Sequence, residues 1–193
     1  QAAAAYSDRQ VGRLLTALQN SPFAQNTIVV LVSDHGYHLG QKEQWEKFLL
    51  YEQTTHIPFL IAAPGMANGQ RCGRPVSLID LYPTLVELCQ LPTRKGLEGR
   101  SLVPLLKKPD TPWQPALMTY LKGNHAVRDE EWRYIRFSDG SEELYHTKTD
   151  PHEWRNIAND PTHAAVKKRL AKWLPTHDAA PAPDVRVEIP QRR

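Results

Sequence analysis

An aspartate and a histidine lie side by side where metal chemistry is possible. Asp34 and His35 come shortly after the β-branched and apolar run 27–32 and directly before Gly36. Aspartate and histidine are both ordinary ligands of divalent metal ions. Neighbouring side chains of a regular strand point to opposite faces, so both reach one ion only where the backbone leaves the extended form, as Gly36 permits. The alternative is an aspartate that caps a turn beside a surface histidine.

The elements around this pair predict an α/β domain. Residues 2–19 carry apolar side chains at helical spacing, and residues 27–32 have the continuous apolar character of a strand buried on both faces. A second strand of the same kind is expected at 58–63. The Asp-His pair then lies at the carboxyl end of a strand, where open α/β sheets bind their ligands. The first helix has no N-cap, so we expect the sequence to enter an element of a longer or processed chain.

The second part of the chain has a different pattern. A helix is expected after Asp80 as its N-cap, and the proline-rich stretch 109–115 indicates a linker. A strand is expected at 116–120, and strands 132–137 and 143–146 are expected to form a hairpin. A final helix starts at Asp160-Pro161. We therefore predict a large α/β part at 1–108, a small antiparallel sheet with one packed helix at 109–176, and an Ala/Pro-rich tail at 177–193.

Composition excludes several classes of protein. The 193 residues include 24 basic and 21 acidic side chains, a formal net charge of +3, which is too balanced to predict nucleic-acid binding. No apolar stretch is long enough for a membrane span. Cys72 and Cys89 form no metal-type pair; we expect Cys89 to be buried on a helical stripe and Cys72 to be either free or paired.

Several motifs resemble those of a known family. Asp34-His35-Gly36, then Leu39-Gly40, Trp45-x-Lys47 and Thr55-His56-Ile57-Pro58, is similar to the metal-and-lysine segment of type I sulfatases in the alkaline phosphatase superfamily. The likeness is greatest to the iduronate-2-sulfatase branch, and the runs 124–128, 132–136 and 143–145 resemble its small C-terminal subdomain. The resemblance implies the C-terminal part of an alkaline-phosphatase-like sandwich, a mixed sheet flanked by helices.

The resemblance also implies roles for individual residues. Asp34 and His35 would bind one divalent cation, most often calcium in this family, although zinc and manganese stay open because calcium prefers oxygen ligands. Lys47 would contact the sulfate ester and neutralise charge that develops during its cleavage. His38 and His125 are candidates for lining the substrate pocket, with a structural role as the alternative. Lys42 stands where related chains often have histidine, and we expect it to be a surface lysine.

The nucleophile of that family is absent from this sequence. Sulfatases use a formylglycine made from Cys or Ser in a Cys/Ser-x-Pro/Ala-x-Arg motif, and neither Cys72 nor Cys89 lies in such a motif. An Asp-Asp metal pair typical of the family is missing too. We therefore expect this chain alone to be inactive and to form, with an N-terminal half, a hydrolase of sulfated sugars or other sulfate esters. A phosphonate or phosphodiester hydrolase and a non-catalytic remnant are the alternatives. The family implies a periplasmic, secreted or lysosomal location.

Overall fold

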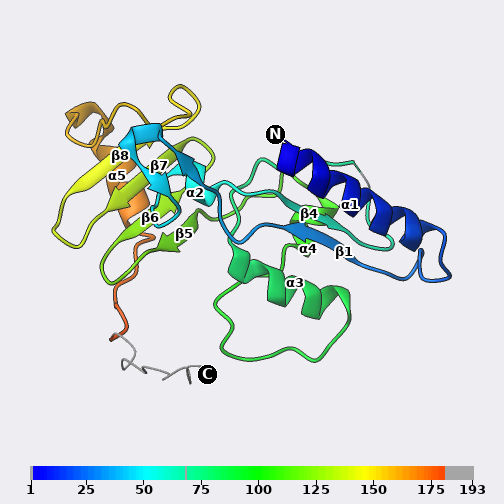
Figure 1. Cartoon of the computed structure of the whole chain (residues 1–193). Helices are drawn as coiled ribbons and strands as arrows, with labels where there is room; N and C mark the ends of the chain where they lie inside the picture. The colour runs from blue at the N-terminus through cyan, green and yellow to red at the C-terminus, as the bar shows by residue number, and fades with distance from the viewer. Residues whose placement is uncertain (1, 68, 181–193) are drawn as a thin grey trace, which may run out of the picture. The chain divides into compact units, whose positions relative to one another are not determined.

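The structure is a computed structural model that describes residues 2–67 and 69–180 (Figure 1). The chain forms two compact units, and each contains segments that are distant in sequence. The described residues of unit 1 lie within Gln1–Asp34, Ile57–Gly73 and Leu78–Thr111. Unit 2 consists of His35–His56, Arg74–Ser77 and the chain from Pro112 onward. The sequence predicted boundaries at residues 108 and 176, which stay predictions, and residues 181–193 of the expected tail lie outside the described residues. The structure groups His35–His56 with the C-terminal part.

Unit 1 is built on one long helix and a pair of antiparallel strands. Helix α1 spans Ala2–Gln19, as predicted, and strands β1 (Val29–Val32) and β4 (Phe59–Ala62) pair with Val29 opposite Ala62. The expectation that β1 is buried on both faces is wrong for this chain, because Leu31 and Val32 are exposed. The two strands form a sheet of their own, so no further strand of the described residues pairs with either of them.

Two shorter helices complete unit 1. Helix α3 (Leu81–Leu88) follows a 3-10 turn, η2 (Leu78–Asp80), and α4 spans Val103–Lys107. Asp80 precedes α3 as predicted, but its side chain does not cap the helix. Its carboxylate instead accepts a hydrogen bond from the backbone N–H of Arg100 at 2.8 Å, and thereby ties the chain before α4 to the start of α3.

Unit 2 contains a four-stranded antiparallel sheet in the order β5-β6-β7-β8. The strands are β5 (Ala116–Thr119), β6 (His125–Arg128), β7 (Trp132–Arg136) and β8 (Glu142–His146). The predicted hairpin is confirmed, since β7 and β8 pair with Trp132 opposite His146. Each strand connects to its neighbour in sequence, which gives a meander.

Both faces of this sheet are packed, unlike the strands of unit 1. On one face Val127, Tyr134 and Leu144 contact Leu170 of α5 (Ala164–Ala171) and Leu174 after it. The side chain of Asp160 accepts a hydrogen bond from Thr162 at the start of η3 (Pro161–His163), which confirms the predicted cap at this helical end. The other face buries a second cluster: Leu50, Ala126, Ile135 and Tyr145.

Leu50 in that second cluster belongs to His35–His56, which we call the site segment. The site segment contains two short strands, β2 (His38–Leu39) and β3 (Trp45–Glu46), paired antiparallel across the 3-10 turn η1 (Gln41–Glu43), and one helical turn, α2 (Glu52–Thr55). It leaves unit 1 after β1 and returns to it before β4. The small sheet of unit 2 is therefore the surface on which the site segment packs.

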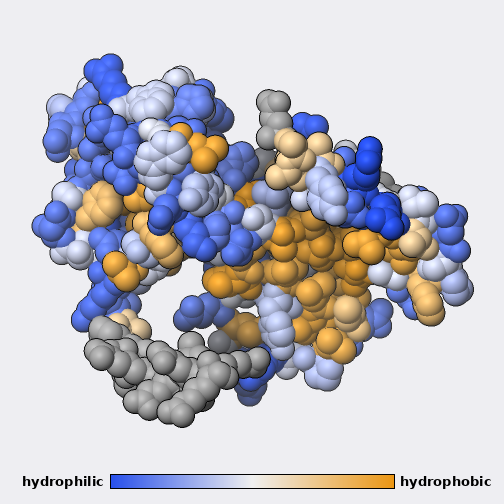
Figure 2. Space-filling model, in the orientation of Figure 1, coloured by the Kyte–Doolittle hydropathy of each residue, from blue (hydrophilic) through white to orange (hydrophobic). Residues whose placement is uncertain are grey.

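Unit 1 leaves a broad apolar surface uncovered. Figure 2 shows hydrophobic side chains gathered over β1, β4 and α3. Leu31 of β1, Leu60 of β4 and Ile79 of η2 are exposed, the last two at 56% each, and no residue of Ala2–Gln19 is buried. Exposed apolar surface on this scale marks an interaction site in a folded protein.

Two further expectations meet the structure here. Cys72 and Cys89 are both free and exposed, so the expected burial of Cys89 is wrong: it lies just beyond the end of α3. Among the helices of the described residues, none combines the length and the apolar character that crossing a membrane requires.

Candidate functional site

His35 and Lys47 meet within the site segment. The Nζ of Lys47 lies 2.9 Å from the Nε2 of His35, and the Nδ1 of His35 lies 2.8 Å from the carbonyl oxygen of Gly36. A carbonyl oxygen only accepts, so Nδ1 carries the proton and Nε2 presents its lone pair to the lysine ammonium. Sequence reasoning placed these two residues in one site, and the structure places their side chains in contact.

Gly36 is required where the chain turns after His35. Its N–H donates to the carbonyl of Thr54 at 2.8 Å, which joins the start of the site segment to α2. A Cβ at this position would lie 1.9 Å from the carbonyl oxygen of Gln53, a contact that backbone atoms cannot relieve without moving. The sequence argument required Gly36 for backbone freedom; the close approach of α2 is a second reason that the sequence did not show.

The possible metal ligands are Asp34 and His35. The boundary between the two units falls between these adjacent residues, and Asp34 is exposed while His35 is half-buried. The tautomer of His35 is that of metal-binding histidines, which usually donate one ring N–H to a carbonyl or carboxylate and bind through the other nitrogen, but in this structure the Lys47 ammonium occupies the Nε2 lone pair. Within residues 2–67 and 69–180, no three His, Cys, Asp or Glu side chains form a metal-binding group. Metal binding by Asp34 and His35 stays a prediction.

His38 is fully buried beneath the site segment. Its Nδ1 lies 3.1 Å from the carbonyl oxygen of Gln41, its ring makes an edge contact with Tyr51, and its Nε2 has no hydrogen-bond partner. Complete burial removes His38 from contact with solvent in this structure. Its geometry matches the structural alternative, and substrate contact by His38 stays an untested prediction.

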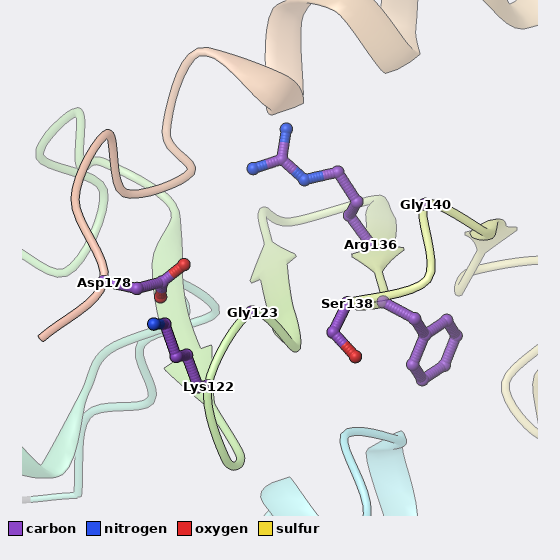
Figure 3. A pocket seen from close by; sticks show the side chains of 7 residues that line it. Lys122, Gly123, Arg136, Ser138, Gly140 and Asp178 are labelled. Atoms are coloured by element: carbon purple, nitrogen blue, oxygen red, sulfur yellow. The ribbon is translucent and has the colours of Figure 1, made fainter. Parts of the chain in front are cut away.

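His125 is also buried, at the start of β6. Its Nδ1 lies 2.9 Å from the Oγ1 of Thr119, and its Nε2 lies 3.0 Å from a carboxylate oxygen of Asp178. Asp178 borders an open hollow on unit 2 (Figure 3), whose lining residues are Lys122, Gly123, Arg136, Phe137, Ser138, Gly140 and Asp178. The hollow contains neither Lys47 nor His35. The role of His125 as a substrate contact likewise stays a prediction.

A buried ion-pair network fixes the C-terminal side of the site segment. The Nε of Arg133, on β7, lies 2.5 Å from a carboxylate oxygen of Glu153, and these side chains are 1% and 0% exposed. Arg133 also donates to the carbonyl of Leu50 at 2.9 Å and pairs with Glu52, which Arg128 contacts as well. The second oxygen of Glu153 accepts the N–H of Glu52 at 2.9 Å. These contacts satisfy the buried charges and hold residues 50–52 against the sheet.

The electrostatic balance of Glu52 follows from this network. Burial raises the pKa of the Glu52 carboxyl, but the neighbouring guanidinium groups of Arg133 and Arg128 outweigh it and hold the pKa below its ordinary value. Glu52 is therefore ionised at neutral pH, as its two arginine partners require.

Lys42 is not the surface lysine that the sequence predicted. Its Nζ donates to the carbonyl of Glu153 at 2.6 Å and to the hydroxyl of Tyr145 at 3.0 Å. The same Nζ lies 4.5 Å from the ring centroid of Tyr51 and 4.6 Å from that of Tyr145, within cation–π distance of both. We call this set the lysine socket: the two tyrosine rings and the Glu153 carbonyl. Tyr145 and Glu153 lie 103 and 111 residues after Lys42 in the sequence, so sequence spacing could not reveal the lysine socket.

Glu143 orients the two tyrosines of the lysine socket. Its carboxylate oxygens accept hydrogen bonds from the hydroxyls of Tyr145, at 2.8 Å, and Tyr51, at 3.2 Å. Burial, reinforced by this carboxylate, raises the pKa of both tyrosine hydroxyls, so each stays a protonated donor. The Tyr145 oxygen is then free to accept from Lys42 while its proton points to Glu143.

Comparison with known proteins gives one family. The model of the Sulfatase family matches residues 1–91. A protein called Sulfatase from Formosa agariphila is 41% identical over 179 residues, which cover 92% of this chain and 35% of that protein. Arylsulfatase K of Gallus gallus is 32% identical over 80% of this chain and 32% of its own length. This chain thus spans about a third of the curated relatives that it matches.

Solved structures agree on the fold. A protein solved in complex with its substrate D-glucosamine-2-N,6-O-disulfate shares 27% identity, with a TM-score of 0.72 over 86% of this chain and 36% of that one. The phosphonate monoester hydrolase of Agrobacterium radiobacter shares 28% identity, with a TM-score of 0.74 over 86% of this chain and 37% of that one. The predicted α/β fold of the C-terminal part of such proteins is confirmed.

Proposed function

We propose that this chain, which belongs to the sulfatase family, supplies a sulfate-contacting lysine and two metal ligands to a sulfate-ester hydrolase. The proximity of Lys47 to His35 carries this proposal, because it brings a cationic side chain next to a candidate metal ligand in one short segment. Binding of a metal ion at Nε2 would require Lys47 to leave that nitrogen. The chain spans about a third of its curated relatives, so the rest of the active site would come from an N-terminal part.

The role proposed for Lys47 is electrostatic. Its ammonium, half-buried and directed by His35, would bind an oxygen of the sulfate ester and stabilise the charge that builds up as the ester bond breaks. Loss of one such charge-stabilising donor typically lowers kcat by about 10²- to 10³-fold. A metal ion on Nε2 of His35 would displace the ammonium of Lys47, which would then be available to the sulfate ester.

Asp34 and His35 are proposed to hold a divalent cation, with calcium favoured by the family resemblance and zinc or manganese left open. When bound, such an ion would neutralise negative charge on the sulfate group. Aspartate contributes a hard oxygen and neutral His35 a nitrogen lone pair, so the donor set suits zinc or manganese as well as calcium. At least one more protein ligand would have to come from the N-terminal part.

The nucleophile is proposed to be a formylglycine on that N-terminal part. The uncovered apolar surface of β1, β4 and α3 supports a large partner segment, because it is the kind of surface that the rest of a sheet would cover. A sulfated sugar is the proposed substrate class, supported by the glucosamine disulfate bound to the structural relative. The iduronate-2-sulfatase branch is a narrower prediction; the relatives named above include arylsulfatase K instead.

A phosphonate or phosphodiester hydrolase is the second candidate, because the hydrolase from Agrobacterium radiobacter shares the fold at similar identity. A non-catalytic remnant is the third. The two enzymes differ in which ester they cleave faster, and the remnant cleaves neither.

The test uses the protein that contains this chain together with its N-terminal part. Intact-mass measurement under denaturing conditions first shows whether a second polypeptide is present and whether a cysteine has been converted to formylglycine. Rates on a sulfated glucosamine and on a phosphonate monoester are then compared for the wild type, Lys47→Ala, and Lys148→Ala as a control. Lys148 is an exposed lysine of the same unit, paired with Glu131.

A sulfatase is supported if the sulfated sugar is cleaved faster, Lys47→Ala lowers kcat by about 10²-fold or more, and Lys148→Ala changes it less than twofold. Preference for the phosphonate would establish the second candidate. Metal analysis of Asp34→Ala and His35→Ala provides a separate readout, since each should lose bound divalent cation. If an intact, metal-loaded protein cleaves neither ester, the non-catalytic remnant is the remaining candidate.

A further inference from the structure

The tip of the site segment has a backbone conformation that needs outside support. Lys42 and Glu43 have φ angles of 55° and 58°, in the left-handed region that side chains other than glycine rarely adopt. Such residues cost free energy unless the surrounding structure holds them. The side chain of Lys42 enters the lysine socket, so the residue with the unfavourable backbone is also the residue that is anchored.

We propose that Lys42 is a positioning residue, and that its ammonium, held in the lysine socket, fixes Lys47 and His35 in their working geometry. The inference rests on the function proposed above for those two residues. Lys42 itself lies within the turn, and its ammonium contacts Tyr145 and Glu153 rather than Lys47 or His35. It would act through the short hairpin that joins them.

The hairpin provides a direct mechanical link. The N–H of Gly40 donates to the carbonyl of Gln44 at 3.0 Å, and β2 pairs with β3 so that His38 lies opposite Glu46. Lys47 follows β3 directly. Holding the turn at Lys42 therefore sets the direction in which the chain enters Lys47, while Gly36 and Thr54 hold the other end of the segment.

Glu153 unites the two anchor points of the site segment. Its carbonyl oxygen accepts from Lys42, and its carboxylate binds Arg133 and the N–H of Glu52. Lys47 lies halfway between Lys42 and Glu52 in sequence. A single buried residue of unit 2 thus fixes the chain on both sides of the sulfate-contacting lysine, at 0% exposure of its own side chain.

The test compares Lys42→Met with Lys148→Met in the protein that contains the N-terminal part. Methionine keeps a side chain of similar length and the same backbone strain but removes the ammonium. Lys148→Met is the matched control, because it removes an exposed ammonium and one ion pair from the same unit. Amide exchange at Gly36, Gly40 and Gln44 reports the order of the site segment, and kcat and KM report its consequence.

We expect Lys42→Met to speed exchange at Gly40 and Gln44 by about tenfold or more, as loss of a charged hydrogen bond does. We expect kcat to fall by about 10- to 100-fold, the effect of a misplaced catalytic group, with a smaller change in KM. Lys148→Met should leave all three quantities within twofold of the wild type. Lys42→Arg keeps a cation, so its amide exchange should be slower and its kcat higher than those of Lys42→Met.

Unchanged exchange at Gly40 and Gln44 in a folded Lys42→Met protein would overturn the proposal, whatever the activity. Faster exchange with an unchanged kcat would overturn it as well, since the turn would then not set the geometry of Lys47. If Lys42→Met does not fold, the same criteria apply to Lys42→Gln, which also lacks the ammonium. Should the wild type cleave no ester, the exchange data alone decide on Lys42, and the sulfatase proposal fails separately.

Discussion

Replacing Arg133 with methionine should strongly destabilise unit 2. The substitution removes the guanidinium that pairs with the Glu153 carboxylate at 2.5 Å and leaves that carboxylate at 0% exposure without its cation. The carbonyl of Leu50 loses its 2.9 Å donor in the same step. Methionine fills a similar volume, so the loss comes mainly from charge and hydrogen bonding.

The expected loss is about 3–5 kcal/mol in the free energy of unfolding, the usual cost of removing one partner of a buried ion pair. In a domain of about 100 residues, that corresponds to a fall in Tm of roughly 15–30 °C. Arg133→Met combined with Glu153→Leu removes both charges and should be more stable than Arg133→Met alone. Such a result would show that Arg133 and Glu153 stabilise the fold as a pair.

Tryptophan fluorescence measures this unfolding selectively. All five tryptophans of the chain, Trp45, Trp113, Trp132, Trp154 and Trp173, belong to segments of unit 2. A urea titration followed by their emission therefore reports unit 2 even while unit 1 is folded, unfolded or covered. Lys148→Met provides the control for a change confined to the surface.

The reasoning is refuted if Arg133→Met lowers the free energy of unfolding by less than about 1 kcal/mol, a value typical of exposed pairs. It is also refuted if adding Glu153→Leu to Arg133→Met lowers the free energy of unfolding by as much as Glu153→Leu does in the wild type. Either result would mean that Arg133 and Glu153 do not stabilise each other in a buried site.

Three other perturbations have defined outcomes. Gly36→Ala places a Cβ 1.9 Å from the Gln53 carbonyl, and a loss of about 1–3 kcal/mol by the same urea titration is expected; no loss would mean that α2 does not approach so closely. The pKa of Glu52 is lower in the folded than in the unfolded protein, so ionised Glu52 stabilises the fold above about pH 4.5, and this stabilisation disappears as the pH falls through the folded pKa. Glu52→Gln should therefore make the free energy of unfolding less dependent on pH in the acid range. The chain purified without a partner should bind a hydrophobic dye strongly or aggregate, and Leu31→Lys with Leu60→Lys should reduce both; a non-aggregating, dye-silent monomer would contradict the uncovered surface of unit 1.

Local pattern predicted the elements of the fold well. The helix at Ala2–Gln19, the hairpin of β7 and β8 and the cap at Asp160 each depend on residues close together in sequence. The burial of β1 could not be predicted in the same way, because it depends on which strands are present to cover it. Asp80 shows the same limit: its type suits a cap, but its carboxylate binds the distant N–H of Arg100.

The candidate site divides along the same line. The neighbourhood of Asp34, His35 and Lys47 was visible because motif residues lie close together in sequence, and the structure adds the 2.9 Å contact of Lys47 with His35. The support beneath them was not visible. Lys42 looked like an ordinary surface lysine, since its socket is built by Tyr145 and Glu153 from the far part of the chain.

The long separation between Lys42 and Glu153 affects the order in which the protein assembles during synthesis. The two residues are 111 positions apart, so at about 5–20 residues per second the ribosome makes Glu153 about 5–20 s after Lys42. The site segment emerges early, between strands β1 and β4, yet its anchors on β7 and after β8 emerge late. Its working conformation is therefore among the last features to form, and a nascent chain released before Glu153 would carry Lys47 on an unfastened loop.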